Sequence, residues 1–167
     1  MLTGWRDEKG ETRFTPASKN DEVNLDELTR ANLDDASRFA KVVDVTVDWV
    51  WSYADMTPGK TDREKREKYR QAAMKPGITR PATPALWWAF RITFEKSPRL
   101  LDADNVAKLI VDAFSGSKRI QADNSPLFEK TKLYDDDTVQ FVRVVQVAGA
   151  PGPKDRSRVE VFACIAE

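Results

Sequence analysis

The chain has 167 residues, of which 41% are hydrophobic and 32% charged, and its 27 basic residues balance its 27 acidic ones. This composition is typical of one globular domain, and no apolar run is long enough to cross a bilayer. Histidine is absent and Cys164 is the sole cysteine, which excludes histidine-based zinc sites, Ser-His-Asp triads and internal disulfides. We therefore expect a cytoplasmic protein, in which Cys164 is a small buried hydrophobic residue.

The N-terminal region differs in composition from the rest of the chain. Residues 1 to about 20 carry few large apolar side chains and indicate an irregular, poorly ordered arm. A capping box at Asn24 and apolar residues at helical spacing then predict a helix near 24–40. We therefore expect two regions, an N-terminal arm with its helix over 1–40 and a main domain over 41–167.

Two strands and a polar helix are predicted in the first half of the main domain. Apolar and polar residues alternate over 43–51 and over 85–95, which is the pattern of half-buried strands. Between them, a capping box at Thr61 opens a helix that ends before Pro76. Its few apolar positions lie near its end, so we expect most of this helix to face solvent or a ligand.

The clearest element is the next helix, which has Asp104 as its expected N-cap and Gly116 as its C-cap glycine. Its apolar residues recur at three- and four-residue spacing and predict one buried face. A long, mostly polar connection over 117–134 follows, and a hairpin of strands over 139–147 and 158–166 closes the chain. These elements predict a small α/β fold of the α+β kind, with a mixed sheet of about four strands and two or three helices.

Aspartates gather around the start of this clear helix. Asp102 and Asp104 lie at its beginning, and the run Asp135-Asp136-Asp137 ends the long connection. Carboxylates held together repel one another, and hard oxygen ligands of this kind suit Mg²⁺, or Mn²⁺, rather than zinc. An ion so bound lowers the pKa of a bound water and neutralises charge on a phosphate. The pattern therefore indicates metal-dependent phosphodiester chemistry.

Lys108 lies one turn into the helix, on the same face as Asp104 and Asp112. From there its ammonium group can stabilise the transition state or the leaving oxygen as a point charge, while Asn105 can orient an aspartate or a water. A purely structural alternative stays open for each group. Asp104 can be only a helix cap, Asp104 and Lys108 only a surface ion pair, and the run at 135–137 only a turn before a strand.

A basic stretch precedes this cluster. Between Lys60 and Arg80, eight basic residues stand against three acidic ones, a net charge of +5. A basic helix beside an acidic metal site fits a protein that grips a phosphate backbone and cuts it. The candidate phosphate contacts are Lys65, Arg66, Lys68 and Arg70. A solvated helix face with ion pairs is the alternative, and charge alone favours it.

Two motifs resemble those of the RusA family of Holliday-junction resolvases. The first is Asp102-Ala-Asp-Asn-Val-Ala-Lys-Leu-Ile-Val-Asp-Ala-Phe, and the second is Asp135-Asp-Asp-Thr-Val. The family signature is D-x-D-N-x-x-K-x-x-x-D-A followed by a D-D-x-x-V strand entry, so the resemblance covers roughly residues 85–147. By this resemblance the metal-binding aspartates are Asp102, Asp104 and Asp136, and the essential lysine is Lys108.

The resemblance implies a RusA-like fold that acts as a symmetric homodimer with Mg²⁺ or Mn²⁺, its two active sites making paired nicks across branched DNA. The function it predicts is a structure-selective endodeoxyribonuclease of the crossover junction type, which resolves four-way junctions in DNA recombination and repair. Two alternatives stay open. One is a non-catalytic protein with a RusA-like fold that binds branched DNA or serves in assembly, and the other is a metal nuclease that acts on flaps or other branched DNA.

Overall fold

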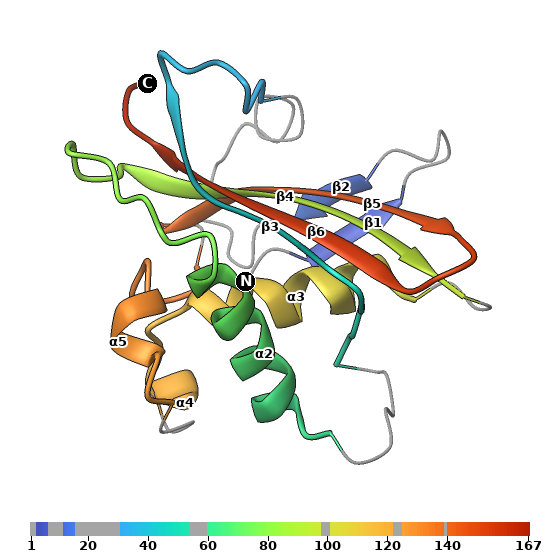
Figure 1. Cartoon of the computed structure of the whole chain (residues 1–167). Coiled ribbons are helices and arrows are strands. Elements are labelled where there is room, and N and C mark those ends of the chain that lie inside the picture. The colour runs from blue at the N-terminus through green and yellow to red at the C-terminus, as the bar shows by residue number, and fades with distance from the viewer. Residues whose placement is uncertain are drawn as a thin grey trace.

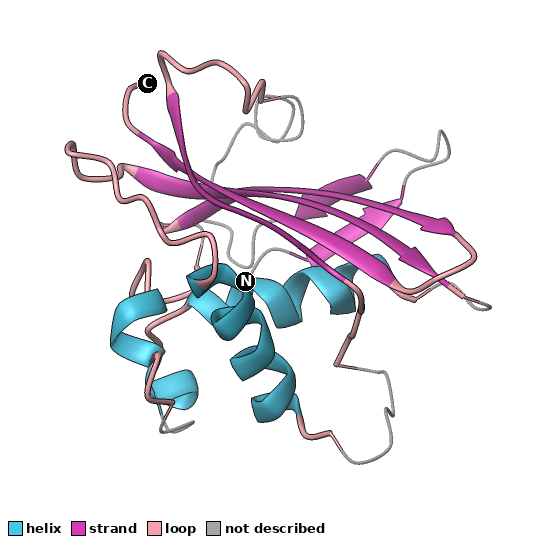
Figure 2. Ribbon diagram, in the orientation of Figure 1, coloured by secondary structure: helices cyan, strands magenta, loops and turns pink. Residues whose placement is uncertain are grey.

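Over the residues that it describes, the computed structural model of the chain has a four-stranded sheet, two long helices, two short helices and a separate pair of N-terminal strands. The described residues are 3–6, 12–15, 31–53, 60–97, 101–121, 125–138 and 140–167. The elements are β1 Thr3–Arg6, β2 Thr12–Thr15, β3 Phe39–Val47, α2 Asp62–Met74, β4 Trp87–Lys96, α3 Ala103–Phe114, α4 Lys118–Gln121, α5 Phe128–Thr131, β5 Val142–Pro151 and β6 Arg156–Cys164. The helices lie on one side of the four-stranded sheet (Figures 1 and 2).

The sheet has the strand order β3-β6-β4-β5. β6 runs antiparallel to both of its neighbours, whereas β4 and β5 are parallel. A parallel pair needs a crossover connection, and α3 lies in the segment that joins β4 to β5. The predicted fold class, a small α+β fold with a mixed sheet of four strands, is confirmed.

The predicted C-terminal hairpin is wrong. β5 and β6 lie on opposite sides of β4 and share no ladder with each other. The turn between them passes the end of β4, where the N–H of Gly152 donates to the carbonyl of Lys96 at 3.4 Å. Alternation identifies both strands because it shows which side chains face the core, but it does not specify which strand pairs with which.

The face of the sheet toward α2 and α3 carries the larger hydrophobic core. Strand residues such as Val43, Phe90 and Val161 are fully buried there. The predicted buried face of α3 is confirmed, because all of its residues are buried: Val106, Leu109, Ile110, Ala113 and Phe114. Burying side chains of this size contributes about 1.5–3 kcal/mol each. This packing fixes α3 against the sheet and so fixes the residues on its outer face.

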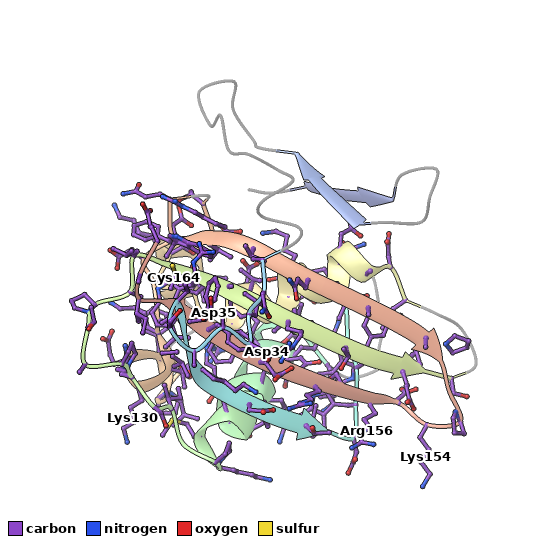
Figure 3. All side chains as sticks on the ribbon, turned by 90° about the horizontal axis from the view of Figure 1, so that it is seen from above. Asp34, Asp35, Lys130, Lys154, Arg156 and Cys164 are labelled. Carbon is purple, nitrogen blue, oxygen red and sulfur yellow. The ribbon has the colours of Figure 1, made fainter. Side chains whose placement is uncertain are left out.

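The opposite face of the sheet is covered as well. The loop around Asp34 lies over it (Figure 3), and the Nε2 of Gln146 donates to the carbonyl of Ala31 at 2.8 Å. Cys164 is a free, buried thiol in this layer, as predicted. The buried side chains of the layer are Leu33, Phe39, Trp87, Ala89, Val144, Phe162 and Cys164.

The helix predicted near 24–40 is wrong over its described part. Residues 31–38 form turns and β3 begins at Phe39, so the predicted boundary between 40 and 41 falls within a strand. The Oδ1 of Asp35 accepts hydrogen bonds from both the N–H and the hydroxyl of Ser37. Such local side-chain bonds compete with helical ones and favour turns. Residues 24–30 lie outside the described residues.

The expectation of an irregular arm is wrong for two short segments. β1 and β2 pair antiparallel, from Thr3 opposite Thr15 to Arg6 opposite Thr12. Their sequences, Thr-Gly-Trp-Arg and Thr-Arg-Phe-Thr, contain the aromatic and β-branched residues that favour strands. This segment therefore forms a pair of strands, although its low hydrophobicity predicted no regular structure.

The connection after α3 is more structured than predicted. It contains α4 and α5, and it buries Ile120, Phe128 and Leu133. The N–H of Gly116 donates to the carbonyl of Tyr134 at 2.7 Å, so the chain returns to the end of α3. A Cβ at Gly116 would lie 2.5 Å from Cδ of Lys132, so glycine serves close packing here. The return brings the run at 135–137 beside α3.

Candidate active site

α3 begins two residues earlier than predicted. Ala103 is the first helical residue, so Asp102 with its extended backbone occupies the N-cap position. The side chain of Asp102 makes no capping hydrogen bond. Asp104 lies in the first turn, where its Oδ1 accepts from the N–H of Asn105 at 3.0 Å. The prediction that Asp104 is the N-cap is wrong, and both carboxyl groups are exposed to solvent.

These two carboxyl groups contact each other. Hydrogen bonding to Asp104 raises the pKa of Asp102, and burial and the charge of Asp104 raise it further. Each of these influences disfavours the second negative charge. Two exposed carboxylates in contact form an arrangement that binding of a cation would relieve.

Lys108 is held between two other carboxylates. Its Nζ donates to Oδ2 of Asp137 at 2.9 Å and to Oδ1 of Asp112 at 3.5 Å. The side chain of Lys108 is 27% exposed, so the ammonium group is fixed by protein contacts yet open to solvent. Burial alone would raise the pKa of Asp137, but the hydrogen bond and charge of Lys108 outweigh it and the pKa is lowered. The predicted spacing of Lys108 and Asp112 on one helix face is confirmed.

Asp112 extends this group toward the loop after β3. Burial raises the pKa of Asp112, whose side chain is only 6% exposed, although hydrogen bonds from Tyr53 and Lys108 oppose the shift. The hydroxyl of Tyr53 donates to Oδ2 of Asp112 and accepts from Nη1 of Arg66 at 3.0 Å. Burial, and then the charge of Asp112, raise the pKa of Tyr53, so its hydroxyl stays protonated and donates.

The three aspartates of the run at 135–137 go to different places. Asp137 bonds Lys108, whereas Oδ1 of Asp136 accepts from the N–H of Asp137 at 2.9 Å. Asp135 lines a cavity of about 340 Å³ together with Arg80 and Trp88. The side chain that the fold brings to Lys108 is therefore that of Asp137, one position beyond the aspartate assigned from the resemblance.

The predicted metal-binding set is not assembled as one group. Among the residues that the structure describes, no three acidic or cysteine side chains lie close enough together to hold a metal ion. Asp102 and Asp104 contact each other, and Asp136 is partly exposed in its own turn. The paired carboxylates still suit Mg²⁺, because this ion is commonly held by one or two carboxylates with waters and phosphate oxygens.

The basic helix does not lie as predicted. Lys65, Arg66 and Arg70 are 2%, 7% and 0% exposed, so the prediction that the polar part of α2 faces solvent or a ligand is wrong for these three residues. Of the four candidate phosphate contacts, Lys68 is the exposed one. The Nζ of Lys65 donates to the carbonyl of Ser52 at 3.0 Å, and Nε of Arg70 donates to that of Ala113 at 2.9 Å. These cations connect the helix to the loop after β3 and to α3.

The sequence did not predict a role for Tyr53, the pairing of Asp137 with Lys108, or the inward direction of Arg66. Tyr53 stands in an aromatic segment whose Trp49 and Trp51 stack on each other at 5.3 Å, a pattern that resembles core packing. A polar helix with buried cations has no distinct periodic signature, because long aliphatic stems bury while their charged ends find partners.

The chain matches no protein-family model and no curated protein. Within the described residues, no helix has the length and apolar character needed to cross a membrane. The resemblance to the RusA family therefore rests on the residues of the two motifs and on their order along the chain.

Proposed function

We propose that the chain is a Mg²⁺-dependent endonuclease of the RusA kind that cuts branched DNA, with four-way junctions as its substrate. The observation that carries the proposal is the contact between Asp102 and Asp104, one turn from a lysine that two further carboxylates hold in place. An acidic pair beside a positioned ammonium group suits a phosphodiester that must be bound, polarised and cleaved.

Asp102 and Asp104 would hold the Mg²⁺ ion, and Asp136 is the candidate for a further ligand. The chemistry that such an ion supplies is activation of a water and neutralisation of phosphate charge. Mn²⁺ has similar oxygen preferences and is expected to substitute for it.

Lys108 would contact the phosphate. An ammonium group has three N–H donors, and within the described residues the carboxylates of Asp112 and Asp137 take two of them. The third donor is then available to an oxygen of the scissile phosphate. Because the two carboxylates fix the ammonium group, little side-chain freedom is lost when it meets the substrate.

Paired nicks require two copies of this site. A symmetric homodimer would present two identical sites to two related strands of a junction, which is the oligomeric state we propose. Lys68 remains a candidate for phosphate contact, and Arg63, the other exposed basic side chain of α2, is added to it. Neutralising both together should weaken junction binding and reduce its salt dependence.

The test is cleavage of a labelled synthetic four-way junction beside linear duplex and flap DNA, with Mg²⁺, Mn²⁺ or EDTA. We expect symmetric, metal-dependent nicks in the junction, lost in Asp104→Asn while junction binding by mobility shift is retained. Asp44→Asn, which changes an exposed aspartate of the opposite sheet face, is the matched control and should cut like the wild type.

Each other outcome points to an alternative. Cutting of flaps in preference to junctions would identify a nuclease for other branched DNA. Junction binding without cleavage by the wild type in either metal would indicate a non-catalytic DNA-binding or assembly protein. Unchanged cutting by Asp104→Asn would contradict the assignment of the site.

A further inference from the structure

A hydrogen-bonded chain of side chains links the loop after β3, α2 and α3. Nη1 of Arg66 donates to the hydroxyl of Tyr53 at 3.0 Å, and that hydroxyl donates to Oδ2 of Asp112. The other oxygen of Asp112, Oδ1, accepts from Nζ of Lys108 at 3.5 Å. Each oxygen of the Asp112 carboxyl group therefore has its own donor, one from the loop and one from the helix.

Burying the charged side chains of this hydrogen-bonded series costs desolvation free energy, which indicates a role beyond packing. Arg66 is 7% exposed and Asp112 is 4% exposed, so both charges have left water. Packing alone would be served as well or better by apolar residues of similar volume, because desolvation commonly outweighs the attraction between buried charges. A buried chain of polar groups that is fully bonded does fix one side-chain arrangement. The arrangement fixed here is that of the Asp112 carboxyl group.

Consecutive residues of α2 hold consecutive residues of the loop. Nζ of Lys65 donates to the carbonyl of Ser52 at 3.0 Å, while Arg66 bonds the hydroxyl of Tyr53 and lies 6.0 Å from the centre of its ring. This double contact places the hydroxyl group against α3. Among the described residues, the Tyr53 hydroxyl is the donor to Oδ2 of Asp112, since Lys108 bonds the other oxygen.

We infer that Tyr53 and Arg66 are positioning residues of the site, which fix Asp112 and through it the ammonium group of Lys108. This inference rests on the proposed function for its catalytic meaning, since Lys108 is the group assigned to the phosphate. Asp137 holds Lys108 from the other side at 2.9 Å, so the ammonium group is set by two carboxylates, of which Tyr53 and Arg66 control one.

The test compares Tyr53→Phe and Arg66→Gln with the wild type and with Tyr69→Phe. Tyr69 is a matched control because its buried hydroxyl bonds Ser157 at 3.1 Å and the backbone of Trp51, so it lies beside the same loop but bonds neither Asp112 nor Lys108. We expect kcat for junction cleavage to fall about tenfold to a hundredfold in Tyr53→Phe, the same range as for loss of an outer-shell partner that orients a metal ligand. KM and the melting temperature should change no more than in Tyr69→Phe.

A second measurement does not depend on cleavage. Competitive acetylation of lysines, read by mass spectrometry, reports how tightly each ammonium group is held. Labelling of Lys108 should rise about threefold or more in Tyr53→Phe and Arg66→Gln, because an Asp112 carboxyl group freed to rotate holds it less well. Exposed Lys68 and the other lysines should be labelled as in the wild type.

The two measurements separate the two claims. A wild type that cuts no branched DNA would overturn the proposed function, and the labelling of Lys108 would still decide whether Tyr53 and Arg66 position it. A wild type that cuts, with kcat and Lys108 labelling in Tyr53→Phe equal to those in Tyr69→Phe, would overturn the positioning role alone.

Discussion

Two groups of charged side chains lie on opposite faces of the sheet, and they differ in how their charges are balanced. On the outer face, Glu160 is 3% exposed and accepts from Arg91 at 2.7 and 2.9 Å and from Lys41 at 2.7 Å. Arg91 also forms two hydrogen bonds with Asp34, whose label in Figure 3 lies over this face. Acids and bases alternate there, so each buried charge is compensated within the protein.

The group on the helix face is balanced only in part. Lys108 compensates Asp112 and Asp137, but each influence on the pKa of Asp102 raises it. Asp102 and Asp104 are exposed and touch each other, and no cation of the described residues is bonded to either, so a cation from solvent can bind there. A cluster whose charges compensate one another therefore serves the fold, whereas an exposed pair of like charges is where a ligand is expected. Four experiments test this contrast.

The largest effect is expected when the helix-face group loses its cation. Lys108→Met should lower kcat for junction cleavage by about a hundredfold to a thousandfold, as removal of one transition-state-stabilising donor does. Single-turnover cleavage with saturating enzyme measures this step. Lys154→Met, in the exposed turn between β5 and β6, is the control for loss of a lysine. Equal rates in both variants would remove Lys108 from the site.

Breaking the outer-face group should affect stability and leave cleavage intact. Glu160→Ala removes the buried partner of several cations and should cost about 3 kcal/mol of unfolding free energy. Chemical unfolding measures the loss, with exposed Glu129→Ala as control. Cleavage per folded molecule should match the wild type. A large loss of kcat at unchanged stability would show that the outer face is not merely structural.

The pH dependence of stability should carry the signature of Glu160. The hydrogen bond from Arg91 lowers the pKa of Glu160 below its ordinary value of 4.5, against an opposing effect of burial. A lowered folded-state pKa stabilises the fold above the unfolded value, and this contribution is lost as pH falls through the folded pKa. Unfolding free energies of wild type and Glu160→Gln should therefore converge in acid. A constant difference from neutral to acidic pH would contradict this.

The smallest effect has the opposite sign. Asp104→Asn removes the repulsion from Asp102, so the metal-free protein should gain a few tenths of a kcal/mol, the scale of exposed charge pairs. Added Mg²⁺ should raise the melting temperature of the wild type and leave that of Asp104→Asn unchanged. Asp44→Asn should respond to Mg²⁺ like the wild type. An equal Mg²⁺ response in all three proteins would place the ion elsewhere.

Local periodicity in the sequence predicts much of this protein. The spacing of Val106, Leu109 and Ile110 identifies α3 and its buried face, and the same helical geometry puts Lys108 one turn from Asp112. Alternation locates β3, β4, β5 and β6 to within a few residues. These features depend on neighbours along the chain, so a sequence pattern is sufficient to specify them.

Only the tertiary structure decides which distant residues meet. It inserts β4 between β5 and β6, turns Lys65, Arg66 and Arg70 inward, and brings Asp137 to Lys108. It also places Tyr53 against Asp112, a contact across 59 positions of sequence. Strand order and loop return depend on the packing of the whole core, and charged side chains with long stems can face either way until that packing is fixed.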